Sequence, residues 1–137
     1  SVYQLIDKNS LAYEAVEVAK KFVNQSASNL HDHYGDMSPV HSLNNLAVVI
    51  WAFLSFQDSF DEAIGETICC GWDTDCTGAT VGGLIGLDKG SIPELWTDPW
   101  QGRVNTAIAG VGELKLEDLV ERTCKLVDQF SSESDMD

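Results

Sequence analysis

The chain has 137 residues, which is enough for one domain with a hydrophobic core. Its 22 acidic and 8 basic residues give a formal net charge of -14. Because such a charge repels phosphate groups, the composition argues against nucleic acid and anionic membrane surfaces as partners.

The first element that the sequence predicts is an amphipathic helix over residues 10–23. Its apolar residues recur at intervals of three and four, behind a serine cap and ahead of two lysines that suit the negative end of the helix dipole. Residues 24–40 are polar and are expected to form a loop. His31 and His33 in this loop could bind a metal, but no third ligand follows at a set spacing, so solvent-exposed histidines are the favoured interpretation.

Two more helices are predicted next. Residues 41–56 join a polar front to an almost continuous apolar body, which is typical of a helix at the centre of a domain. The length of this segment favours a helix over a buried strand. Residues 58–70 place their apolar side chains on one stripe and carry acidic residues in the first turn, as the positive end of a helix favours.

The stretch that follows combines paired acids with regularly spaced glycines. Its first residues are Gly71-Trp72-Asp73-Thr74-Asp75-Cys76-Thr77, and a helix is expected over residues 75–87, with glycines at positions 78, 82 and 86. Each interior glycine destabilises a helix by about 1 kcal/mol relative to alanine. We therefore expect this helix to pack very closely against a neighbour.

Asp73 and Asp75 lie where the chain turns between two helices. Their carboxylates suit a hard cation such as Mg2+, Mn2+ or Ca2+, and Thr74 or Thr77 could add a hydroxyl ligand. Alternatively, both acids cap the following helix, an effect of up to about 1 kcal/mol each. The spacing alone does not distinguish a cap from a metal site.

Two other motifs match part of this stretch. An EF-hand loop would begin at Asp73, but its twelfth position is Leu84 instead of the required glutamate. The Asp-x-Asp-x-Thr motif of haloacid-dehalogenase-type phosphatases belongs after a buried strand, whereas this sequence indicates helices throughout. Both alternatives are therefore disfavoured.

The rest of the chain predicts turns and one long helix. Residues 88–103 are rich in turn-forming residues, a short helix is expected at 104–109, and a longer one at 116–130. Residues 131–137 read as an acidic, disordered tail. No segment alternates clearly enough for a strand, so we expect an all-α fold, a compact orthogonal helical bundle.

Cysteine usage and hydropathy indicate the cellular setting. The four cysteines include no C-x-x-C pair, and the adjacent Cys69 and Cys70 in an apolar segment indicate buried free thiols, which predicts a reducing, cytoplasmic location. The longest apolar run, residues 46–54, is far shorter than the roughly 20 residues of a membrane span.

The paired-acid motif and its surroundings resemble the ADP-ribosylglycohydrolase family. Gly71-Trp72-Asp73-Thr74-Asp75 with its small-residue helix is similar to the metal motif of that family. The resemblance runs in order from about residue 10 to residue 127, through residues 41–47, 58–64, 92–96 and 116–124.

The resemblance implies an all-α domain that holds two Mg2+ or Mn2+ ions and hydrolyses the bond between ADP-ribose and an acceptor. Asp73 and Asp75 fall on two metal-binding aspartates, Cys76 stands where a hydroxyl is usual, and Thr77 could fill in as the hydroxyl ligand. Trp72 could stack on a ligand ring, and His41 and Asn45 could line the cleft. Packing of Trp72 and helix capping at His41 and Asn44 are the alternative roles.

Members of the family also have an N-terminal half with a Thr-Asp-Asp metal motif and a catalytic acid, and this sequence contains no such motif. We therefore expect residues 1–130 to be the C-terminal portion of a larger helical domain, inactive alone and completed by the N-terminal portion or a complementary subunit. Its ligand would be an ADP-ribosylated substrate or ADP-ribose. The alternative is a non-catalytic, crystallin-like or assembly protein that keeps the fold without the chemistry, and Cys76 is its best support.

Overall fold

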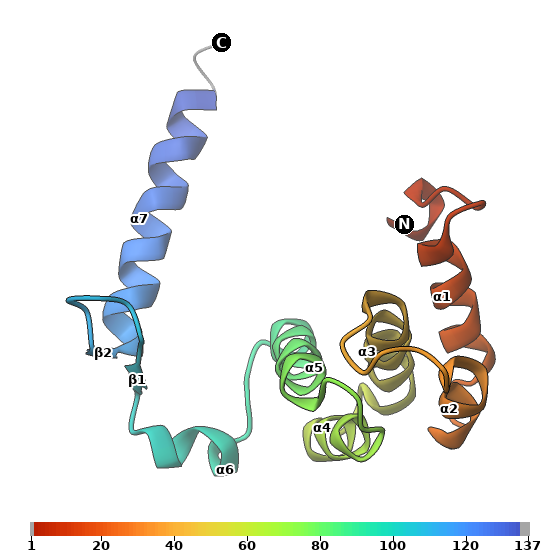
Figure 1. Cartoon of the computed structure of the whole chain (residues 1–137). Helices are drawn as coiled ribbons and strands as arrows, with labels where there is room; N and C mark the ends of the chain where they lie inside the picture. Colours follow the sequence, from red (N-terminus) through yellow and green to blue (C-terminus); the bar gives the residue numbers. More distant parts are fainter. Residues whose placement is uncertain (1, 135–137) are drawn as a thin grey trace. The chain divides into compact units, whose positions relative to one another are not determined.

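The computed structural model describes the backbone of residues 2–134 and the side chains of residues 4–131. The chain divides into two compact units, residues 1–92 and 93–137 (Figure 1). In chain order the elements are η1 (Val2–Leu5), α1 (Leu11–Lys21), α2 (Ser28–Tyr34), α3 (Ser42–Phe56), α4 (Phe60–Cys69), α5 (Thr74–Lys89), α6 (Glu94–Thr97), η2 (Asp98–Trp100), β1 (Arg103–Asn105), β2 (Glu113–Lys115) and α7 (Leu116–Ser134). The predicted all-α fold class is confirmed.

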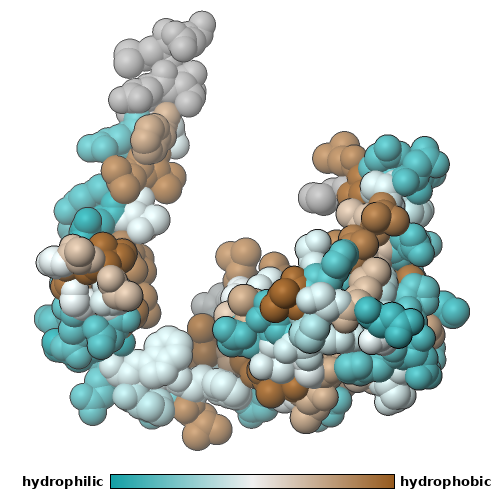
Figure 2. Space-filling model, in the orientation of Figure 1, coloured by the Kyte–Doolittle hydropathy of each residue, from teal (hydrophilic) through white to brown (hydrophobic). Residues whose placement is uncertain are grey.

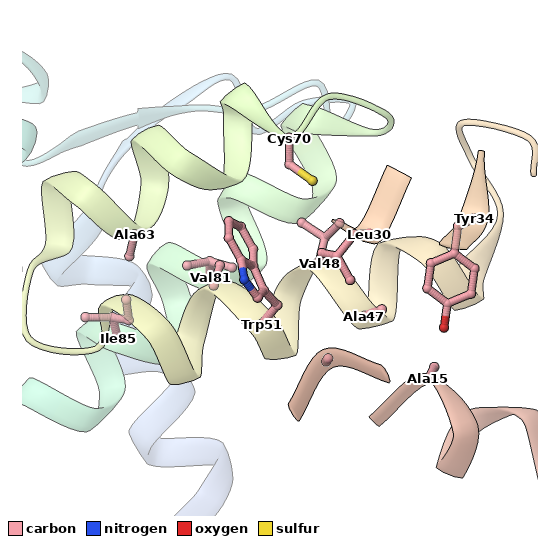
Figure 3. Packing of buried hydrophobic residues seen from close by; sticks show 12 residues of the cluster. Ala15, Leu30, Tyr34, Ala47, Val48, Trp51, Ala63, Cys70, Val81 and Ile85 are labelled. Carbon is pink, nitrogen blue, oxygen red and sulfur yellow. The ribbon is translucent and has the colours of Figure 1, made fainter. Parts of the chain in front are cut away.

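Helix α3 lies at the centre of the first unit and contacts α1, α2, α4 and α5. Its apolar body fills the space between these helices, as its nearly continuous hydrophobic sequence predicted (Figure 3). Trp51 is fully buried there, and its indole Nε1–H donates to the Phe22 carbonyl oxygen at 3.0 Å. This bond ties the centre of α3 to the end of α1.

The regularly spaced glycines of α5 let this helix approach α4 closely. A methyl group at Gly82 would lie 3.3 Å from Ile64 Cδ1, and one at Gly78 would lie 2.8 Å from Ile68 Cδ1. A methyl group at Gly86 would lie 3.2 Å from Ile92 Cγ1. The expected close packing is thus confirmed, and α4 is the main neighbour of these glycines.

The prediction of a loop over residues 24–40 is wrong for the middle of this segment, where α2 (Ser28–Tyr34) forms. Leu30 and Tyr34 are one helical turn apart, and both are buried. Two apolar residues are too few to produce a visible helical period. Packing of α2 against α3 therefore determines this short helix.

The prediction of a short helix at residues 104–109, in the second unit, is also wrong. β1 and β2 pair there as an antiparallel hairpin, with Val104 opposite Leu114. Gly110 and Gly112 have positive φ angles, which glycine adopts at no steric cost, so the chain can reverse between the strands. An exposed ion pair between Arg103 and Glu113 joins the two strands, and it raises the pKa of the guanidinium and lowers the pKa of the carboxyl.

Helix α7 extends farther than the sequence predicted. It runs to Ser134, so the first residues of the expected acidic tail continue the helix, and residues 135–137 lie outside the described part of the chain. Apolar side chains are exposed along α7 (Figure 2). None of the described helices combines the length and apolarity that crossing a membrane requires.

The four cysteines are free thiols, but only one of the adjacent pair is buried. Burial, with a smaller effect from the charge of Glu66, raises the pKa of Cys70 to about 11. Cys69 is exposed, so the expectation of two buried thiols is wrong for this residue. Cys70 is the C-cap of α4 and is buried, whereas the side chain of Cys69 is exposed, because successive residues of a helix point about 100° apart.

Candidate metal site

The candidate site is built on the tight turn that joins α4 to α5. Two successive residues, Gly71 and Trp72, have positive φ angles of 77° and 61°. Glycine adopts this conformation freely, but for a residue with a side chain the left-handed region costs roughly 1–2 kcal/mol. Surrounding contacts must therefore hold Trp72 in place, directly before the first of the two aspartates.

After this turn the structure brings Asp73, Asp75 and Cys76 together. One ligand atom from each lies within 4.8 Å of the others, with Asp73 partly buried and the other two exposed. The Cys76 thiol hydrogen-bonds to Asp73, and this bond, with the negative charges of Asp73 and Asp75, raises the pKa of the thiol. In the part of the chain with described side chains, no other group of potential metal ligands of this kind occurs.

Asp73 occupies the N-cap position of α5, yet its side chain makes no capping hydrogen bond. The capping interpretation would require its carboxylate to accept a bond from a backbone N–H group of the first turn. Asp75 lies in the first turn, where its charge is favoured by the helix dipole. The Asp73 carboxylate therefore does not cap the helix, and one of its oxygens lies within 4.8 Å of the Cys76 sulfur.

Asn45 connects this turn with the start of α3. Its Oδ1 accepts a long hydrogen bond, 3.4 Å, from the Asp73 backbone N–H. Its Nδ2 donates to the carbonyl oxygens of Pro39 and His41 at 2.8 and 2.9 Å. The His41 side chain is exposed, and its Nδ1 accepts the backbone N–H of Leu43, so this ring caps α3.

Thr77 is the remaining residue that the sequence suggested as a metal ligand. It is buried, and its hydroxyl donates to the Asp73 carbonyl oxygen at 2.9 Å. The hydroxyl proton is thus used inside the first turn of α5. Only the lone pairs of this oxygen remain for an ion.

A groove of about 250 Å³ lies between α3 and α5, directly beside this cluster. Leu46 and Val49 contribute apolar surface from α3, and Cys76 and Thr77 belong to the groove as well as to the motif. The other lining residues are Ser42, Asn45 and Thr80. A ligand in this groove would therefore lie next to the paired aspartates.

His31, which the sequence placed in a solvent-exposed loop, contacts this turn. In the structure its ring stacks on Trp72, with ring centres 4.1 Å apart and planes inclined by 26°. Its Nε2–H also donates a hydrogen bond to the Cys70 carbonyl oxygen. His33 instead packs edge-on against Tyr34, so the two histidines of α2 have different surroundings.

Comparison with known proteins identifies the family of the chain. Searches of curated proteins and of solved structures gave no significant match. The family model of ADP-ribosylglycohydrolase matches residues 2–134, which covers nearly the whole chain and includes the paired-acid motif. The chain belongs to the ADP-ribosylglycohydrolase family.

Proposed function

We propose that this chain carries the metal-binding part of a hydrolase that removes ADP-ribose from an acceptor, with Asp73 and Asp75 as ligands to Mg2+ or Mn2+. The observation that carries this proposal is the cluster at the start of α5, in which the Asp73 carboxylate is not used as a helix cap. Membership of the ADP-ribosylglycohydrolase family supports the reaction class.

The donor set fits these ions in part. Two carboxylates suit Mg2+ and Mn2+, whereas a thiol is a soft ligand and a poor partner for either ion. Mg2+ requires near-octahedral oxygen coordination. Asp73, Asp75 and the lone pairs of Thr77 would cover only part of that shell, so water, substrate or groups from an N-terminal portion or complementary subunit would supply the rest. A second ion would need such groups as well.

The net charge of the chain and the groove between α3 and α5 both affect how ADP-ribose would bind. ADP-ribose carries a pyrophosphate, which a chain with a net charge of -14 would repel, and bound cations would offset this repulsion at the site. The groove between α3 and α5 would take part of the ligand beside the ion. Because His31 covers one face of the Trp72 ring, a ligand ring could stack only on the other face.

A calorimetric titration with Mn2+ tests the metal claim. We expect heat of binding for the wild-type chain and none for the double variant Asp73→Asn, Asp75→Asn, which removes both charged ligands. The control variant Asp118→Asn, Asp128→Asn removes two exposed charges from α7 and should bind as the wild type does. Equal heats for all three proteins would refute the metal site.

Measurements of ADP-ribose binding and release test the proposed reaction class. The wild-type chain should bind ADP-ribose in the presence of Mn2+ and lose this binding when a chelator removes the ion. Release of ADP-ribose from a modified protein is expected once the remaining site groups are supplied. If ADP-ribose does not bind even with Mn2+ and the remaining site groups present, the alternative is favoured, namely a helical protein that keeps the fold without the chemistry.

Replacing Cys76 by serine is expected to strengthen Mg2+ and Mn2+ binding. Serine supplies a hard oxygen at the position of the soft sulfur, and the expected gain is on the order of tenfold, comparable with one supporting group at a metal site. Calorimetry of Cys76→Ser against Cys69→Ser measures the effect, because Cys69 is an exposed thiol outside the ligand cluster. Unchanged affinity in Cys76→Ser would mean that residue 76 does not contact the ion.

A further inference from the structure

The turn before Asp73 is a strained segment that local sequence does not explain. Trp72 adopts a φ angle of 61°, although bulky residues rarely occupy this region. Such a conformation persists only where surrounding contacts determine it, and strained residues of this kind occur often at functional sites. The contacts that hold Trp72 therefore also determine where the next residue, Asp73, is placed.

Trp72 packs against the hydrophobic core, and His31 adds further contacts to the turn from a helix that lies about 40 residues earlier in the chain. Its ring covers Trp72, and its Nε2–H donates to the carbonyl oxygen of Cys70, so it holds the turn on both sides of Gly71. The neighbouring Leu30 is fully buried and fixes α2 against the core. His31 is thus attached to a rigid support, while its own side chain lies at the surface.

Asn45 holds the same turn from α3, through its bond to the Asp73 backbone N–H. The two side chains act on opposite ends of the segment, since His31 contacts residues 70 and 72 and Asn45 contacts residue 73. The Asn45 bond is long, at 3.4 Å, and it is the single contact of Asn45 with the turn, whereas His31 contacts the turn at two residues.

We propose that His31 is a positioning residue of the metal site: it fixes the turn at residues 70–72 so that the carboxylates of Asp73 and Asp75 converge. This inference rests on the proposed metal binding at these aspartates. His31 does not contact the ion in this arrangement, because it lies outside the ligand cluster. It acts through Trp72 and through the backbone of Cys70.

The test compares Mn2+ binding by His31→Ala and His33→Ala in the full chain. Both histidines are exposed on α2, but only His31 contacts the turn. We expect His31→Ala to weaken Mn2+ binding by about 10-fold or more, as loss of an outer partner of a metal site typically does. His33→Ala should stay within about twofold of the wild type, a difference too small to indicate a lost partner.

Two further variants separate positioning from a general effect on folding. His31→Gln keeps a hydrogen-bond donor and His31→Phe keeps an aromatic face, so each should restore part of the affinity that alanine loses. Thermal melts should be similar for all four variants, because positioning affects the ion and not the core. If alanine at position 31 unfolds the chain, His31→Leu, which keeps the bulk without the ring or the donor, takes its place in the comparison.

The outcomes distinguish this inference from the function on which it rests. Wild-type Mn2+ affinity in His31→Ala, together with loss of binding in the Asp73→Asn, Asp75→Asn variant, would overturn the role of His31 and leave the metal site standing. Equal losses in His31→Ala and His33→Ala would overturn it as well. If the wild-type chain binds no Mn2+, both proposals fail.

Discussion

Replacing Trp51 by alanine is expected to lower the free energy of unfolding by about 3–5 kcal/mol, the range for large aromatic residues in a core. Trp51 is the largest fully buried side chain, and it packs edge-on against Phe56, with ring centres 5.4 Å apart. Alanine would leave a cavity at the centre of α3 and remove one of the two hydrogen bonds to the Phe22 carbonyl oxygen, which keeps its bond from the Gln25 backbone N–H. Urea denaturation followed by circular dichroism measures the change.

Trp51→Phe and Trp100→Ala are the matched comparisons. Phenylalanine fills most of the space but cannot donate to Phe22, so it should lose the smaller part of the stability, including about 0.5–1.5 kcal/mol for the lost hydrogen bond. Trp100 is 51% exposed in the second unit, and its replacement should cost much less than that of Trp51. Similar losses in Trp51→Ala and Trp100→Ala would contradict the buried position of Trp51.

The sequence predicted the elements that have a strong hydrophobic pattern. α3 was predicted as the central helix because its apolar residues surround it on nearly every side, and it contacts the four other helices of its unit. α2 and the β1–β2 hairpin were not predicted. Each is too short for its period to be visible, and each depends on tertiary packing or on glycines in a loop.

The candidate site, like the fold, could be predicted from the sequence only in part. The sequence could predict that Asp73, Asp75 and Cys76 lie near one another, because they are close in sequence at the start of one helix. It could not predict how the preceding turn orients the Asp73 carboxylate. The stacking of His31 on Trp72 could not be predicted, because 40 positions separate the two residues and tryptophan does not favour a positive φ angle. Contacts between distant segments and strained backbone both require the three-dimensional structure.

Replacing Gly82 by leucine is expected to lower the free energy of unfolding by about 2 kcal/mol, since an overpacking penalty of up to about 3 kcal/mol is partly offset by the better helix propensity of leucine, about 1 kcal/mol. The first carbon of the new side chain would already lie 3.3 Å from Ile64 Cδ1 and 3.7 Å from Phe60 Cζ. The remaining carbons have no space unless α4 moves away from α5. Thermal or urea denaturation measures the loss.

Gly83→Ala provides the control in the next position of the same helix. No atom lies within 4 Å of the added methyl group, so the variant gains helix propensity without a clash, and we expect it to be more stable by about 0.5–1 kcal/mol. Opposite signs for two adjacent glycines would show that contact with α4, and not helix propensity, requires glycine at position 82. A stabilising effect of Gly82→Leu would contradict the close approach of the two helices, on which the placement of Asp73 and Asp75 at the start of α5 also depends.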